Sequence, residues 1–327
     1  MSSDLRFVDR PEDLAALAAE LEREPIVAID SEFIREKTYV PKLEIVQIAT
    51  RDGRIAIVDY GTLGGSPNDP LGRVLAAPGI LKVFHAAEQD LEMLHLATSV
   101  LPAPIWDTQL VTGLFGYVGR SGYTSVVQAL LGERATTGEA LTDWSRRPLH
   151  AEQLRYAAED VRYLIPLYDA EQRELEALGR VAWAEEECRA YRARVEALVG
   201  RRSEATQAYQ RIRGWGRLDR RGLAILRELA VWRESEAARR NRPSGTVVRD
   251  DLLVEVARRK PERVEDLATL RGFHPRDLDR MGPGLVRAVE VGRSAPKETW
   301  PELPPPSVEL EALGRVAWAE EECRAYR

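Results

Sequence analysis

The stretch Ile26-Val27-Ala28-Ile29-Asp30-Ser31-Glu32-Phe33 is an apolar strand that ends in two acids. Residues i and i+2 of a strand point to the same face, so the side chains of Asp30 and Glu32 are expected side by side. Adjacent carboxylates beside a buried strand repel each other unless a cation lies between them. Oxygen ligands favour Mg2+ or Mn2+. The stretch therefore predicts a divalent-metal site suited to phosphoryl transfer. Two solvated acids at a strand end are the alternative interpretation.

Two later segments add side chains of the same kind. Lys82-Val83-Phe84-His85 predicts a short strand, and Asp90 falls in the first turn of the helix that follows it. A carboxylate at that place can also be an ordinary N-terminal charge. Tyr156 and Asp160 are four residues apart, so on a helix they share one face. Each of these signals is weak alone, and their combination is specific.

The combination of D-x-E on a strand, Asp at a strand-to-helix turn and Y-x3-D on a late helix resembles the DEDDy subclass of the DnaQ-like 3'-5' exonucleases. The amino-acid sequence over residues 5–293 is similar to ribonuclease D in particular. The segments that carry this similarity are AIDSEFIREKTYVPKLEIVQIA (28–49), VFHAAEQDLEML (83–94), WDTQL (106–110) and YAAEDVRYLIPLY (156–168).

The resemblance implies a site and a reaction. Asp30, Glu32, Asp90 and Asp160 would hold two divalent cations, Mg2+ or Mn2+, and Tyr156 would orient the attacking water. The reaction would be hydrolysis of 3'-terminal phosphodiesters with release of nucleoside 5'-monophosphates. The implied partner is RNA, in particular tRNA precursors at their 3' ends. A DNA 3'-5' exonuclease and a non-catalytic nucleic-acid-binding protein are the alternatives.

Further positions match the resemblance less firmly. Asp107 is expected to support the site or cap a helix rather than bind metal. Phe33 could stack on the terminal nucleotide, His85 could hydrogen bond to it, and Arg147 could reach a phosphate; packing roles are the alternative for Phe33 and His85. Thr137 stands where such chains usually carry a Lys, which puts substrate affinity or choice in doubt.

The resemblance implies an α/β, ribonuclease H-like exonuclease domain followed by an all-α HRDC domain, the small nucleic-acid-binding module found beside ribonuclease D. The order of the expected elements, strands first and helices after, fits this layout. Strands are expected at 26–32, 43–49, 54–59, 81–84 and 104–106. Helices of the first domain are expected at 11–23, 69–76, 87–96, 108–115, 124–131 and 150–158, followed by a helical stretch over 159–198. Helices of the second domain are expected at 250–258, 263–270, 275–280 and 284–292. The expected divisions are an exonuclease domain with its connecting helix (1–199), a connector (200–216), the HRDC domain (217–293), a Pro-rich linker (294–308) and a tail (309–327).

Charge is divided unevenly along the chain. Residues 1–200 hold 21 Lys and Arg against 32 Asp and Glu, whereas residues 201–300 hold 23 against 15. A basic second half suits a polyanion-binding domain beside an acidic metal site. Arg239, Arg240 and Arg242 are candidate phosphate contacts, and a merely soluble basic rim is the alternative.

Other sequence features indicate the cellular location of the protein and exclude some classes of partner. The start of the chain has no signal-peptide core, no apolar run reaches the ~18 residues of a membrane span, and there are only two cysteines. A cytoplasmic protein without membrane contact is therefore expected. The G-x4-G-K-[ST] loop is absent, which argues against nucleoside triphosphate binding.

The tail repeats an earlier segment. Residues 309–327 copy ELEALGRVAWAEEECRAYR of residues 174–192, predicted as a helix, without a change. A recombined or engineered end and a functional tail that competes for the docking groove of 174–192 are both compatible with this repeat.

Overall fold

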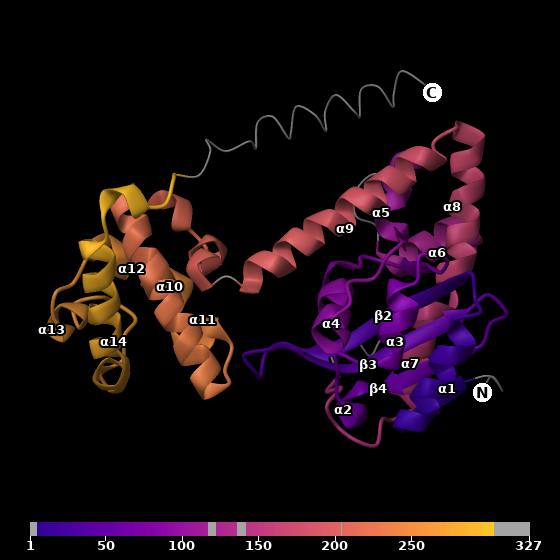
Figure 1. The fold of residues 1–327 in the computed structure, drawn as a ribbon, viewed down its shortest axis with the longest axis horizontal. Coiled ribbons are helices and arrows are strands. Elements are labelled where there is room, and N and C mark those ends of the chain that lie inside the picture. Colours follow the sequence, from indigo (N-terminus) through magenta and orange to yellow (C-terminus); the bar gives the residue numbers. More distant parts are fainter. Residues whose placement is uncertain (1–4, 117–121, 136–141, 204, 304–327) are drawn as a thin grey trace. The chain divides into compact units, whose positions relative to one another are not determined.

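The computed structural model describes residues 5–116, 122–135, 142–203 and 205–303. The predictions on Thr137 and on the tail at 309–327 lie outside this range. The chain divides into two compact units. The first unit is Met1–Glu36 with Pro41–Val199, and the second is Lys37–Val40 with Gly200–Arg327. Figure 1 shows the sheet and its helices in the first unit and the helices of the second.

A mixed six-stranded sheet forms the centre of the first unit, in the order β1-β4-β3-β2-β5-β6. β2 pairs antiparallel with β3 and parallel with β5, while β1 with β4 and β5 with β6 are parallel pairs. The strands are β1 (Leu5–Val8), β2 (Ile26–Ile34), β3 (Lys42–Thr50), β4 (Ile55–Asp59), β5 (Leu81–Phe84) and β6 (Ile105–Asp107). Every predicted strand is present.

Local sequence explains most of these strands. β2, β3 and β4 are rich in Ile and Val, which pack well in a buried sheet. Gly53, at φ 85°, closes the turn between β3 and β4. We did not predict β1, because it is a four-residue strand at the sheet edge and its Leu5 and Phe7 remain 40% exposed.

Helices pack around the sheet of the first unit. One of them, α7, contacts β2, β3 and β4, and α4 contacts β2 and β3. Their bounds are α1 (Pro11–Leu21), α2 (Tyr60–Leu63), α3 (Pro70–Ala76), α4 (Glu88–Thr98), α5 (Thr108–Thr112), a 3-10 turn (Gly113–Phe115), α6 (Tyr123–Leu131), α7 (Ala151–Arg162), α8 (Leu164–Leu178) and α9 (Val181–Ser203). The expected α/β class of this unit is confirmed.

The helical stretch predicted over 159–198 is interrupted twice, at Tyr163 and at Gly179. Gly179 has φ 64°, and the N–H of Arg180 donates to the carbonyl of Leu175, which is how a left-handed glycine ends a helix. Segment 174–192 is therefore not one helix, as predicted, but the end of α8, a glycine break and the start of α9.

The second unit is all-helical, as expected, and α10 packs along α14 at its centre. Its elements are 3-10 turns at Ala205–Arg211, Trp215–Arg217 and Lys297–Thr299 and helices α10 (Arg220–Arg240), α11 (Ser244–Val247), α12 (Asp250–Arg259), α13 (Val264–Leu267) and α14 (Pro275–Ser294). The two helices predicted at 275–280 and 284–292 are one helix, which continues through Pro283. The helix predicted at 263–270 is shortened to four residues. Within the described residues, no helix is long and apolar enough to cross a membrane.

Candidate active site

The acids of β2 lie on the face of the sheet that α7 covers. Asp30 pairs with Gln47 and Glu32 with Ile45 in the register of β2 and β3, and paired residues share a face. Ile45 belongs to a small apolar cluster that includes Ala157 of α7. The packing of α7 onto Ile45 therefore brings the side chains of that helix over Asp30 and Glu32.

Three carboxylates converge at this place. Asp30, Glu32 and Asp160 each offer an oxygen atom, and these atoms all lie within 4.8 Å of one another. The three residues come from a strand and from a helix more than a hundred residues later. Tyr156, one turn before Asp160 on α7, forms a side-chain hydrogen bond with Asp160.

Asp90 adjoins this group from α4 and is 7% exposed. It is not one of the three mutually close carboxylates, although its charge acts on Asp30, Glu32 and Asp160. The hydroxyl of Ser31 donates to Asp90 Oδ1 at 2.5 Å. Ser31 lies between the two acids of β2 and points to the opposite face. β2 thus presents Asp30 and Glu32 on one face. On its opposite face, Ser31 holds Asp90 by a hydrogen bond.

The electrostatics of the group favour a cation. Burial, followed by the charge of Asp160, raises the pKa of Asp30 to about 8. Burial and the charges of Asp30, Asp160 and Asp90 raise the pKa of Glu32 to about 9. Burial also raises the pKa of Asp160 to about 7, against the hydrogen bond from Tyr156, which lowers it. An oxygen-only set of crowded carboxylates fits a hard divalent cation, which would relieve their mutual repulsion.

Asp107 contacts the backbone of α5 and of the turn before α4. It lies at the end of β6, and its carboxylate accepts hydrogen bonds from the backbone N–H groups of Gln109 and Leu110, which caps α5. The same carboxylate accepts from Ala86 N at 3.0 Å and Ala87 N at 2.8 Å. Asp107 therefore fixes the turn that leads into α4 and so the position of Asp90.

Phe33 and His85 have close protein neighbours. Phe33 packs against the main core, and the Arg35 guanidinium lies 4.9 Å from the centre of its ring. His85 Nδ1 is 2.8 Å from Thr108 Oγ1, and its ring meets that of Tyr123 edge-on at 5.6 Å. The sequence analysis did not single out Ser31, whose hydroxyl donates to Asp90. The place of Ser31 between two acids was a usable signal.

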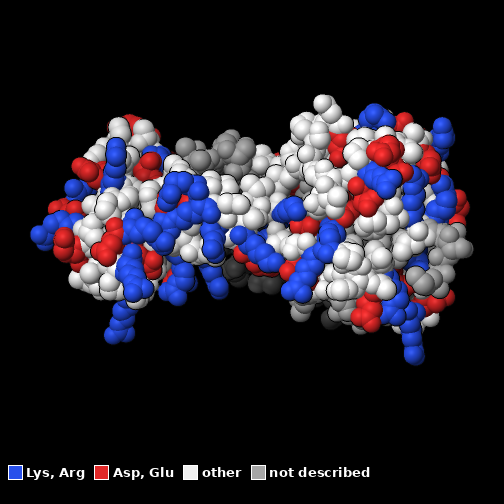
Figure 2. Space-filling model, turned by 90° about the horizontal axis from the view of Figure 1, so that it is seen from below, with Lys and Arg blue, Asp and Glu red and all other residues white. Residues whose placement is uncertain are grey.

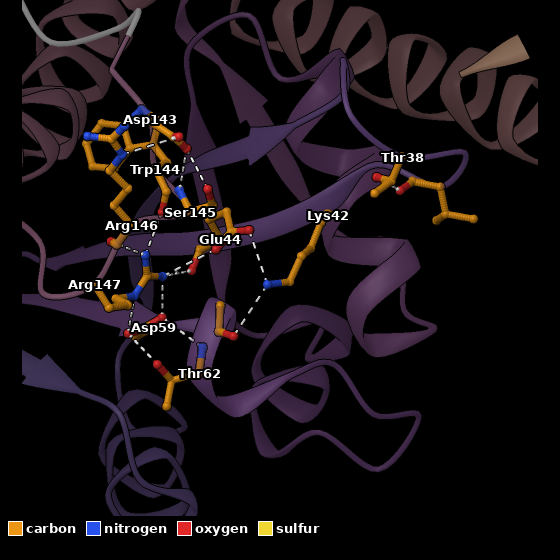
Figure 3. Close-up of polar contacts among 12 residues, drawn as sticks. Thr38, Lys42, Glu44, Asp59, Thr62, Asp143, Trp144, Ser145, Arg146 and Arg147 are labelled. Carbon is orange, nitrogen blue, oxygen red and sulfur yellow. Dashed lines mark hydrogen bonds and ion pairs between the residues drawn. The ribbon is translucent and has the colours of Figure 1, made fainter. Parts of the chain in front are cut away.

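Arg147 does not have the environment expected of a phosphate contact. Its guanidinium donates to both oxygens of buried Asp59, to Glu44 and to the carbonyl of Trp144 (Figure 3). These partners belong to the protein interior, and the Arg147 side chain is 25% exposed. Its donors are committed to internal acceptors.

The arginines expected to bind nucleic acid lie at the end of α10 in the second unit. Arg239 and Arg240 both pair with Glu236, and hydrogen bonds from Arg239 first, then Arg240, lower the pKa of Glu236 to about 2. Arg242 is exposed just after the helix. Figure 2 shows Lys and Arg side chains spread over the face of this unit that it presents.

Comparison with protein families fits this fold and site. Residues 5–176 match a sequence model described as 3'-5' exonuclease, and residues 222–289 match the HRDC domain. The chain is thus a 3'-5' exonuclease with a C-terminal HRDC domain, as the acidic group on β2 and α7 indicated.

Relatives define the family more closely. Ribonuclease D of Granulibacter bethesdensis is 37% identical over 305 residues, which is 91% of this chain and 74% of the relative. The crystal structure of Escherichia coli RNase D, an exoribonuclease involved in structured RNA processing, superposes with a TM-score of 0.82 at 32% identity, covering 92% of this chain and 78% of that one. The chain belongs to the ribonuclease D family of 3'-5' exoribonucleases.

A further solved structure matches a smaller share of the chain. Brucella melitensis NrnC with bound Mg2+ is 28% identical, with a TM-score of 0.51, and covers 59% of this chain and 92% of that one.

Proposed function

We propose that the enzyme uses two divalent cations, Mg2+ or Mn2+, held by Asp30, Glu32, Asp90 and Asp160. The observation that carries this proposal is the approach of the Asp30, Glu32 and Asp160 oxygens to within 4.8 Å of one another in a half-buried, acid-only group. The Mg2+ in the related NrnC structure supports the choice of ion. When bound, the cations would supply activation of water and neutralisation of the leaving oxygen.

Tyr156 is proposed to orient the attacking water. Burial, followed by the charges of Asp160, Glu32 and Asp30, raises the pKa of its phenol, so the hydroxyl remains protonated at neutral pH. A protonated phenol can hold a water molecule by hydrogen bonding but is a poor base. In the reaction water adds to the terminal phosphorus, the bond from phosphorus to the 3' oxygen breaks, and the 3' oxygen takes up a proton.

The proposed substrates are structured RNA precursors, with tRNA precursors as the first candidate. Support comes from the E. coli relative, which acts in structured RNA processing. Arg239, Arg240 and Arg242 of the second unit are proposed to contact phosphates, and Phe33 and His85 to contact the terminal nucleotide. The domain divisions expected from the sequence are kept as part of this proposal.

The test is a time course of product lengths on a labelled tRNA precursor and on matched DNA, with Mg2+, with Mn2+ and with chelator. We expect mononucleotide release from the 3' end of RNA, lost with chelator and in Asp30→Asn. Asp52→Asn, at the exposed turn between β3 and β4, is the matched control and should remain active. Faster degradation of DNA would favour a DNA exonuclease, and activity in Asp30→Asn or with chelator would refute the metal site.

A further inference from the structure

Arg147 is at the centre of an ionic group on the first unit whose two acids are buried. Its Nε donates to Asp59 Oδ2 at 2.6 Å and its Nη2 to Asp59 Oδ1 at 2.5 Å, a two-point pairing. Nη2 also lies 3.4 Å from Glu44 Oε2. The side chains of Asp59 and Glu44 are 2% and 1% exposed. We call Arg147, Asp59 and Glu44 the Arg147 clamp (Figure 3).

The clamp also holds the backbone of the segment before α7. Arg147 Nη1 donates to the carbonyl of Trp144 at 2.5 Å and to that of Arg146 at 2.9 Å. Asp59 belongs to the end of β4 and Glu44 to β3, so the guanidinium ties the 144–147 segment to the sheet. Because the segment runs directly into α7, this tie fixes the place where α7 starts.

Trp144 connects the clamp to the reaction site. Its indole is 2% exposed and shares an apolar cluster with Ile45, Ile57 and Ala157. Its ring centre lies 6.2 Å from that of Tyr156. Tyr156 in turn is hydrogen bonded to Asp160. A continuous series of contacts therefore runs from Arg147 through Trp144 to the phenol beside the acids.

We infer that Arg147 is a positioning residue for hydrolysis: it holds the Trp144 carbonyl, and the Trp144 ring sets the position of Tyr156 beside Asp160. This inference rests on the proposed role of Tyr156. It replaces the phosphate contact expected from the sequence, because the donors of the guanidinium are engaged inside the protein. Lys cannot reproduce the two-point pairing with Asp59, so Arg147→Lys keeps the charge and loses the geometry.

Gly61 gives a second way to disturb the clamp. A Cβ atom at this position would lie 2.3 Å from Arg147 Nη2 and 2.4 Å from Glu44 Oε2. Arg147 Nη2 is held by both acids of the clamp, and the Glu44 carboxylate is paired with Arg147 and Lys42. Gly61→Ala must therefore push the pair apart without removing any polar group. If Arg147→Lys fails to fold, Gly61→Ala tests the same inference.

The main experiment measures kcat and KM on RNA for Arg147→Lys, alone and combined with Tyr156→Phe. A small misplacement of a positioning side chain costs about 10- to 100-fold in rate. We expect Arg147→Lys to lower kcat by that factor with unchanged KM. In the Tyr156→Phe background, Arg147→Lys should lower kcat by less than about a further twofold, because the effects of interacting residues are not additive. A rise in KM with unchanged kcat and a salt slope reduced by about 1 would instead show a phosphate contact and overturn the inference.

Arg51→Lys is the matched control. Arg51 also makes a two-point pairing, with Asp169 at 2.7 and 3.1 Å, in the same unit. Loss of this pairing in Arg51→Lys should leave kcat unchanged. An equal fall in kcat for Arg51→Lys would mean that any lost ion pair in this unit slows the enzyme, and would overturn the specific role of Arg147.

Hydrogen exchange of the full-length protein supplies a readout without activity. Arg147→Lys and Gly61→Ala should each speed amide exchange in α7, at 151–162, and leave α4 unchanged. Protection of α7 equal to wild type in both variants would contradict the inference. This result does not depend on catalysis. It is therefore distinguishable from a failure of the proposed function, which would appear as metal-independent activity of the unmodified enzyme.

Discussion

The phenol of Tyr156 and the carboxylate of Asp160 are joined by a hydrogen bond across one turn of α7. The bond ties the only aromatic hydroxyl proposed for the reaction to one of the proposed metal ligands. Burial raises the pKa of Asp160, and this hydrogen bond lowers it. Removal of the hydroxyl should therefore separate the water-orienting role from the metal-binding role.

Tyr156→Phe is expected to lower kcat by about 100-fold, the lower end of what one proton-handling side chain contributes. Metal affinity should change little, because the four carboxylates remain. Single-turnover rates on labelled RNA and calorimetric titration with Mn2+ would measure the two effects. Tyr39→Phe, at a tyrosine in the second unit, serves as the control. Undiminished kcat in Tyr156→Phe would remove the proposed role of the phenol.

Ser31→Ala tests the support of Asp90. The 2.5 Å hydrogen bond from Ser31 orients the Asp90 carboxylate, and Ser31 itself is 6% exposed. Loss of such a hydrogen bond to a ligand costs about 10- to 100-fold in metal affinity. Mn2+ titration should show this weakening, with activity restored at high metal concentration. Ser235→Ala, where the hydroxyl donates to the Val231 carbonyl of its own helix, is the matched control. Wild-type Mn2+ affinity in Ser31→Ala would refute the support.

The sequence predicted the acids of β2 because a strand has a fixed two-residue period and its residues alone decide which side chains share a face. The four-residue spacing of Tyr156 and Asp160 on a helix was predictable in the same way. That α7 crosses the same face of the sheet as Asp30 and Glu32 came from family resemblance, since no local rule places a helix on a sheet.

The role of Arg147 could not be read from the sequence. Its partners, Asp59 and Glu44, lie 88 and 103 residues earlier, and an arginine near an acidic site has no local feature that tells a phosphate contact from a buried pair. The break at Gly179 was readable in principle, since glycine after a helical run is a common stop. The continuity of α14 through Pro283 was not, because packing against α10 outweighs the loss of one backbone donor.

Arg242→Ala tests the basic end of α10. Proteins that neutralise phosphates lose affinity as salt rises, with a slope of about 0.7 per contact on single strands. We expect Arg242→Ala to lower the affinity for RNA. The salt slope should fall by about 0.7, the value for one lost phosphate contact. Fluorescence anisotropy with labelled RNA over a range of KCl concentrations measures both. Arg51→Ala, at an arginine paired with Asp169 in the first unit, should keep the wild-type slope. A wild-type slope in Arg242→Ala would leave this residue without a role in RNA binding.

Lys82 predicts a pH dependence of stability that is independent of the active site. It lies in β5 with a side chain that is fully buried, and its Nζ donates to the carbonyls of Ala77 and Ala103. Burial, followed by the positive charge of Arg192, lowers the pKa of Lys82 to about 7 from its ordinary value of 10.5. Between these two pH values the unfolded chain binds a proton that the folded chain does not. Stability should therefore rise with pH from about 7 towards 10.5, by at most about 1.4 kcal/mol per pH unit.

Lys82→Met isolates this effect, because methionine fills a similar volume and does not titrate. The difference in unfolding free energy between wild type and variant, measured in urea at several pH values from 6 to 9.5, should move in favour of wild type as pH rises. All other titrating groups are common to both proteins and cancel in the difference. Below pH 7 both states of wild type carry the proton, so the difference should there be constant. A difference that stays flat from pH 7 to 9.5 would mean that Lys82 remains charged in the fold, with the two carbonyls compensating for its burial.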